Sequence, residues 1–156
     1  MPRAVRRLSV LSGVALSAIL GGPLAVAQAS DNLLRTTLNS YAPKIVKDEN
    51  AVKAGLNGYP QGKVKPLVRA LNHEVSDLHK LKSKLVHESA SSGRGSKAKT
   101  DIVKGLGLIA TAYGSLRMDV QAAHGGPVPS AQVNAAVKTD KKGRSKLLAG
   151  LKLLSP

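Results

Sequence analysis

The longest unbroken pattern of apolar positions lies in the second half of the chain. Apolar side chains recur there at alternating intervals of four and three residues, at Ile102, Leu106, Ile109, Tyr113, Leu116, Val120 and Ala123. This rhythm places them on one narrow stripe of a helix that packs along other helices. It predicts a helix over residues 97–124, with Ser96 or Thr100 as its N-cap, against which the other helices pack.

A first predicted helix spans residues 31–55. Its stripe consists of Leu34, Leu38, Tyr41, Ile45 and Val52. Asp48 occupies the missing stripe position, and Ser30 or Asp31 supplies the N-cap. Proline inside a helix removes one backbone hydrogen bond and clashes with the preceding turn, so we expect a kink or a restart just before Pro43.

A second predicted helix spans residues 63–88, and Lys82 falls where its stripe should carry an apolar residue. The stripe is assigned to Val64, Val68, Leu71, Val75, Leu78 and Leu85, flanked by Leu67 and Leu81. A fourth helix begins at Ser130, and two consecutive positions of its stripe are charged, Asp140 and Arg144. This helix is either continuous or broken at residues 139–143. Its unbroken register favours a continuous helix.

Clusters of glycine, proline and serine separate these segments, at residues 55–60, 89–96 and 125–129. Aromatic residues make up only 2% of the chain, so the core must be built from Leu, Val, Ile and Ala, which suits helices better than sheets. Four amphipathic segments joined by short loops predict an all-α fold, an antiparallel up-down-up-down four-helix bundle, as a single domain over residues 30–156.

Small residues share one face of the central helix beside its heptad. Gly107, Ala110 and Gly114 lie at i, i+3 and i+7. We interpret them as a strip along which a neighbouring backbone approaches closely. The alternative is a helix that must bend or open at its glycines.

The N-terminus has the order of a secretory signal peptide. Arg3, Arg6 and Arg7 precede an uncharged apolar run over residues 8–20, and the tripeptide at residues 27–29 is an A-x-A cleavage site. The apolar run is shorter than the ~20 residues of a membrane-spanning helix. The pattern predicts that residues 1–29 are removed by cleavage near Ala29. The mature protein is then expected to be secreted or extracytoplasmic, as a bacterial exported protein.

Charge narrows the classes of partner. The chain has 24 Lys and Arg against 9 Asp and Glu, a formal net charge of +15, and loss of the three arginines at its start leaves +12. It has no cysteine, which excludes disulfides, a lipid-modified cysteine and thiolate chemistry. A strongly basic exported domain is attracted to anionic cell-wall polymers, to anionic membrane surfaces and, without sequence preference, to DNA.

Candidate catalytic and metal-binding motifs are weak. His73, Glu74, Asp77 and His79 are crowded together, but the second histidine is six residues after the first, so the pair does not form the H-E-x-x-H zinc motif. Haem attachment, a nucleophile elbow and a phosphate loop are likewise missing from the sequence. We expect no cofactor, no metal, no small-molecule substrate and no enzymatic activity.

The charged stripe residues have a structural interpretation. Asp140 and Arg144 are four residues apart and can pair on their own helix, whereas Lys82 is expected to pair with Asp101 or Asp31. Such pairs can fix the register of a bundle. If Asp140 and Arg144 form a self-contained pair, replacing both by leucine should preserve or raise stability.

The remaining candidate is a basic surface on the second helix and the segment after it. Its proposed anion-binding residues are Arg69, His73, Lys80, Lys84, His87, Arg94, Lys97 and Lys99. Histidine becomes charged below about pH 6.5, so binding should strengthen on acidification. We expect a non-enzymatic binding or structural protein of the cell envelope or extracellular space. The alternative is a protein–protein module, in which the strip at Gly107, Ala110 and Gly114 accepts a partner helix or a second copy of the chain.

Overall fold

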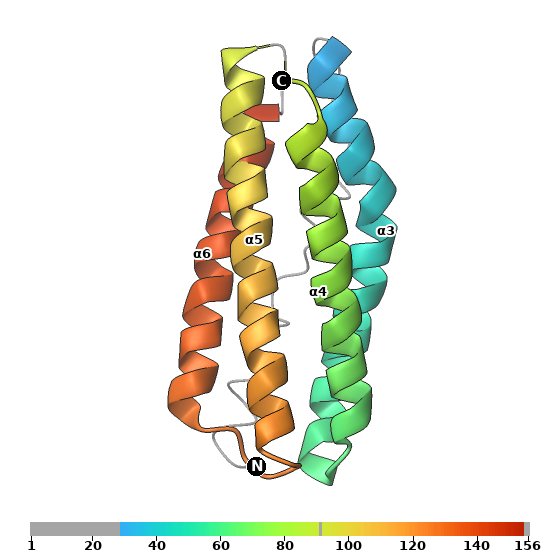
Figure 1. Ribbon diagram of the computed structural model, residues 1–156, viewed down its shortest axis with the longest axis vertical. Helices are drawn as coiled ribbons and strands as arrows, with labels where there is room; N and C mark the ends of the chain where they lie inside the picture. Colours follow the sequence, from blue (N-terminus) through green and yellow to red (C-terminus); the bar gives the residue numbers. More distant parts are fainter. Residues whose placement is uncertain (1–28, 91, 155–156) are drawn as a thin grey trace.

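The computed structural model describes residues 29–90 and 92–154, and these form four long helices. The helices are α3 (Ala29–Gly58), α4 (Val64–His87), α5 (Gly93–Ala122) and α6 (Ser130–Leu154), and the 3-10 turn η1 (Tyr59–Gln61) follows α3. They pack in chain order, α3 on α4, α4 on α5 and α5 on α6, consistent with an up-down bundle (Figure 1). The predicted all-α four-helix class is therefore confirmed. The predicted signal peptide lies outside the described residues, apart from Ala29.

The central heptad is the core of the bundle. Its members from Ile102 to Val120 are buried, and only Ala123, which follows the last residue of α5, is half-exposed. Leu71, Leu78 and Leu85 of the stripe predicted for the second helix are buried, but its three valines are not part of the buried stripe. Val64, Val68 and Val75 are only half-buried, and the buried stripe of α4 is Leu67, Leu71, Glu74, Leu78, Leu81 and Leu85.

α3 runs through Pro43 without restarting, contrary to expectation. Pro43 lies on the exposed side of α3, as does Asn39, whose carbonyl would otherwise accept the missing proline N–H. Water can satisfy a carbonyl in that position, so the helix continues. Glu49, and not Asp48, takes the inward position that the pattern predicts here. Two intervals of four residues follow one another, from Tyr41 to Ile45 and from Ile45 to Glu49, so the alternation of four and three is interrupted.

α5 begins at Gly93, four residues earlier than predicted, and neither Ser96 nor Thr100 is its N-cap. Ser92 is the cap, and its hydroxyl accepts a hydrogen bond from the backbone N–H of Gly95 at 2.8 Å. The same hydroxyl donates to Asp31 Oδ2 at 3.1 Å. Asp31, predicted to cap its own helix, therefore ties α3 to the start of α5.

The closest helix pair is α5 with α6, and three glycines allow the approach. A Cβ on Gly105 would lie 2.7 Å from the carbonyl oxygen of Gly143, and one on Gly150 would lie 2.7 Å from that of Ala98. The strip predicted at Gly107 and Gly114 is not this contact, because a Cβ on Gly107 would meet only the Lys82 side chain and one on Gly114 would meet nothing within 4 Å. α6 is continuous through Gly143, as its register indicated.

Candidate functional site

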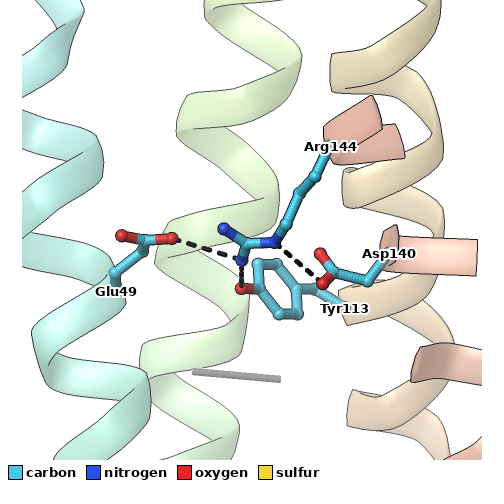
Figure 2. Close-up of polar contacts among 4 residues, drawn as sticks. All are labelled: Glu49, Tyr113, Asp140 and Arg144. Carbon is cyan, nitrogen blue, oxygen red and sulfur yellow. Dashed lines mark hydrogen bonds and ion pairs between the residues drawn. The ribbon is translucent and has the colours of Figure 1, made fainter. Parts of the chain in front are cut away.

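A buried polar network crosses the middle of the bundle and centres on Arg144 of α6. Its Nε donates to Asp140 Oδ2 at 2.8 Å, and one terminal nitrogen donates to the Tyr113 hydroxyl at 3.0 Å and to Glu49 Oε1 at 3.3 Å. Figure 2 shows the guanidinium between the two carboxylates, with the Tyr113 ring beside it. Arg144 therefore does not form a self-contained pair with Asp140, because it also joins α6 to α3 and α5.

Burial shifts the pKa values of three ionisable groups in this network. Burial raises the pKa of Asp140, and the attraction and hydrogen bond of Arg144 offset part of that rise. Burial likewise raises the pKa of the Tyr113 hydroxyl. Burial opposes the charged form of Arg144, but Tyr113, Asp140 and Glu49 outweigh it and its pKa rises. The guanidinium thus stays charged, and the phenol stays protonated, across the physiological range.

Glu74 of α4 lies next to this network and was missed as an interior residue. Its side chain is fully buried, and neither carboxyl oxygen has a hydrogen-bond partner among the described residues. Burial, with added repulsion from Glu49 and Asp48, raises the pKa of Glu74 to about 9, although Arg144 acts in the opposite direction. Glu74 is therefore neutral at pH 7, which lowers the cost of burying it.

The sequence contained a signal for Glu74. The intervals from Leu67 through Leu71, Glu74, Leu78 and Leu81 to Leu85 alternate between four and three, as strictly as in the central helix. Three valines, Val64, Val68 and Val75, offered a competing stripe that avoided placing a carboxyl in the core. Residue type alone favours the stripe that contains the valines, because every member of it is apolar. The structure instead buries the stripe that contains Glu74.

The crowded residues considered as metal ligands diverge in the fold. Glu74 points into the core, whereas His73 and His79 are exposed and Asp77 is half-buried. Across residues 29–90 and 92–154, no three His, Asp or Glu side chains lie close enough to hold a metal ion.

The predicted basic residues of α4 lie along its boundary with α3. Two hollows open between these helices, and we call the surface that contains both the α3/α4 face. The hollow near η1 has a volume of about 770 Å³ and is lined by Lys47, Lys63, Lys65, Arg69 and His73, with Asp48 as its single acidic residue in the described part of the chain. This hollow brings Arg69 and His73 together with three lysines that sequence reasoning had not grouped with them.

The second hollow of the α3/α4 face, near the end of α4, has a volume of about 510 Å³. Lys80, Lys84 and His87 line it together with Tyr41 of α3 and one acidic residue, Glu88. The ammonium groups of Lys84 and Lys44 lie 5.5 and 5.3 Å from the centre of the Tyr41 ring. Cations within about 6 Å of an aromatic face are held by its quadrupole, so the Tyr41 ring attracts both lysines.

Asp48, which lines the hollow near η1, interacts with the Asp77 carboxyl of α4. Burial raises the pKa of Asp48, and the neighbouring Asp77 carboxyl raises it further, while His73 and Lys47 act in the opposite direction. Lys80 pairs with Asp77 at 2.8 Å on the exposed surface. Positive charge on the α3/α4 face is therefore concentrated in the hollow near η1, because Asp77 partly neutralises Lys80 and Glu88 lines the second hollow.

The other predicted anion-binding residues do not join this face. Arg94 and Lys97 are exposed in the first turns of α5. Lys99 has a structural role, because its ammonium donates to the carbonyl oxygens of Val86 and Glu88 at 2.7 and 2.6 Å and so closes the C-terminal end of α4. Lysine near a helix C-terminus also complements the helix dipole.

Lys82 has neither of its predicted partners. Asp101 pairs with Lys146 at 3.2 Å, and Asp31 accepts from Ser92. The Lys82 side chain is half-buried and its ammonium lies over Gly107, 3.4 Å from where a Cβ would be. Within residues 29–90 and 92–154, Lys82 forms no ion pair.

The fold and these sites define a class: an all-α four-helix protein with a buried polar network and a basic face between two helices. None of the helices in the described part of the chain is both long and apolar enough to cross a membrane. Comparison with protein-family models, curated proteins and solved structures found no match.

Proposed function

We propose that the protein is exported, loses residues 1–29, and acts without catalysis as a binding protein of the cell envelope or extracellular space. In this proposal, it associates with anionic polymers through the α3/α4 face. The feature that carries the proposal is the hollow near η1, where Lys47, Lys63, Lys65, Arg69 and His73 surround one carboxyl group. Converging cations in a concave surface focus the field and attract an anionic group more strongly than the same charges spread apart.

The two ends of the α3/α4 face suit a polymer better than a single small anion. Basic residues line both hollows, beside Asp48 in the first and Glu88 in the second, so a chain with repeated anionic groups can contact lysines at both ends. Each contact that replaces a condensed counterion makes binding more sensitive to salt. Anionic cell-wall polymers fit this pattern, and DNA would bind without sequence preference.

Cleavage after Ala29 is compatible with this proposal. α3 begins at Ala29, so the mature chain would keep almost the whole helix and all residues of the α3/α4 face. We expect the mass of the secreted protein, and its N-terminal sequence, to correspond to a chain that starts at Ser30. A protein that retains residues 1–29 outside the cell would contradict this part of the proposal.

The binding test is co-sedimentation of the mature protein with purified cell walls, and separately with DNA, across a salt series. The variant Arg69→Glu with Lys84→Glu reverses one charge at each end of the α3/α4 face. Lys141→Glu with Lys142→Glu, at exposed positions of α6, changes the net charge equally and serves as the control. We expect the first variant to leave the walls at a lower salt concentration than the control.

Three results would weigh on the proposal. Equal losses in both variants would mean a generic polycation without a defined face. Wall binding that survives several hundred millimolar salt and is lost only in the face variant would support a shaped site. A wild-type protein that binds neither walls nor DNA at low salt would overturn the proposal.

A further inference from the structure

A second groove runs along the other side of α4, between α4 and α5. It has a volume of about 670 Å³ and extends along α5 from Lys99 to Thr111, or about 18 Å at 1.5 Å per residue. Its floor is apolar, since Val103 and Leu108 are half-buried and Val86 is 46% exposed. Because Gly107 has no side chain, the groove stays open at this position, and the nearest side chain to it there is that of Lys82.

Lysines line this groove, and no acidic residue of the described chain does. Lys82 and Lys104 are the two that matter, because the ammonium of Lys99 already donates to two carbonyl oxygens. Lys82 is half-buried over Gly107, and neither Lys82 nor Lys104 has a carboxylate partner within residues 29–90 and 92–154. A partly desolvated ammonium without a counter-ion gains when a carboxylate approaches it.

We propose that the α4/α5 groove docks an acidic amphipathic helix of a protein partner. The partner would place apolar side chains, spaced at i, i+3 and i+7, on Val86, Val103 and Leu108, and glutamate or aspartate opposite Lys82 and Lys104. The inference is independent of the α3/α4 face and assigns the chain a second binding surface.

Charge argues against a second copy of this chain as the occupant. The protein carries a formal net charge of +15, so a groove edged by lysines would meet a surface of the same sign. Like charges across an interface oppose association. The shape argues for a helix, because the groove is shallow and follows two helices for about three turns.

The probe is a fluorescent helical peptide of about 16 residues, with leucine on one face and glutamate on its flanks. A scrambled peptide of equal composition, in which the leucines no longer share a face, is the control ligand. Binding to the full-length chain is measured by fluorescence anisotropy. We expect Lys82→Glu with Lys104→Glu to weaken binding about tenfold or more beyond the loss in Lys141→Glu with Lys142→Glu.

A second pair of variants covers the case in which charge reversal prevents folding. Val86→Gln removes an exposed apolar side chain from the floor, and Met118→Gln removes one that is 56% exposed on α5 outside the groove. We expect only Val86→Gln to weaken peptide binding. Arg69→Glu with Lys84→Glu should weaken it no more than the α6 control, which separates failure of this proposal from failure of the α3/α4 face.

Several outcomes would overturn the inference. These are equal binding of the scrambled peptide, equal losses in the groove and control variants, and a Val86→Gln variant that binds as tightly as wild type. Vesicles of phosphatidylglycerol provide a further comparison. If the groove variants lost vesicle binding while peptide binding was unchanged, the groove would belong to a membrane surface and the partner helix would be wrong.

Discussion

Arg144 bonds to a residue of its own helix and to residues of two other helices. Asp140 and Arg144 are neighbours on one helix and could be paired from the sequence alone. The bonds from Arg144 to Glu49 and Tyr113, residues of two other helices, could not. A helical period says which residues of one helix share a face, but not which face of the next helix they meet.

Replacing Asp140 and Arg144 together by leucine should therefore lower the free energy of unfolding, by about 3–5 kcal/mol, rather than preserve it. Glu49 and the Tyr113 hydroxyl would be left in the core without the guanidinium. Urea denaturation at pH 7 measures the change. Adding Glu49→Leu and Tyr113→Phe should recover much of the loss, because the two groups that Arg144 bonded on α3 and α5 are then also removed.

Asp101→Ala with Lys146→Ala is the matched control, since this pair also links α5 to α6 but its lysine is 42% exposed, against 8% for Arg144. An exposed pair contributes about 0–1 kcal/mol. If the double leucine variant were as stable as wild type, Asp140 and Arg144 would behave as a self-contained pair, as the sequence suggested.

The helices themselves were predicted closely where the local sequence decides them. The continuous α6 and the bounds of α4 followed from periodicity and from the glycine and proline clusters. The start of α5 did not, because Ser92, Ser96 and Thr100 are all good N-cap residues. Ser92 is the one whose hydroxyl also reaches Asp31 of α3, which is a tertiary contact.

Glycines of α5 and α6 give opposite predictions for the same substitution. Gly143→Ala should destabilise the protein by about 1–3 kcal/mol, because its Cβ would lie 2.8 Å from Ile109 Cγ1 and 2.9 Å from the Gly105 carbonyl oxygen. Gly114→Ala should stabilise it by up to about 1 kcal/mol, because its Cβ meets nothing and alanine favours a helix. Thermal unfolding of the two variants distinguishes them.

The same sign for both alanine variants would contradict the assignment of the closest helix contact. If Gly114→Ala were the damaging one, the strip of Gly107, Ala110 and Gly114 would be the packing surface after all.

At the scale of the whole molecule, buried carboxyl groups set how stability depends on pH. Below about pH 4.5 Glu74 is protonated in both the folded and the unfolded chain. Between there and about pH 9 the unfolded chain loses this proton and the folded chain keeps it, so stability falls as pH rises. The slope from this group reaches about 1.4 kcal/mol per pH unit. Asp48 and Asp140, whose pKa values are also raised, act in the same direction at the acidic end.

Glu74→Gln should flatten this dependence. Glutamine does not ionise, so its cost in the core is constant, and the variant should gain on wild type steadily from pH 5 to pH 8.5. Free energies of unfolding from urea titrations at three pH values within this range measure the difference. Parallel curves for variant and wild type would mean that Glu74 ionises in the folded protein much as it does in the unfolded chain.

The sequence by itself determined the helical class, the approximate helices and the basic residues that share the outer side of α4. These are properties of single segments, because the 3.6-residue period and the turn residues act over a few positions. The partners of Arg144, the burial of Glu74, the α5–α6 contact at Gly105 and Gly143, the two hollows of the α3/α4 face and the α4/α5 groove emerged only from the tertiary structure. Each depends on how helices are rotated and shifted against one another, which is set by packing between residues far apart in the chain.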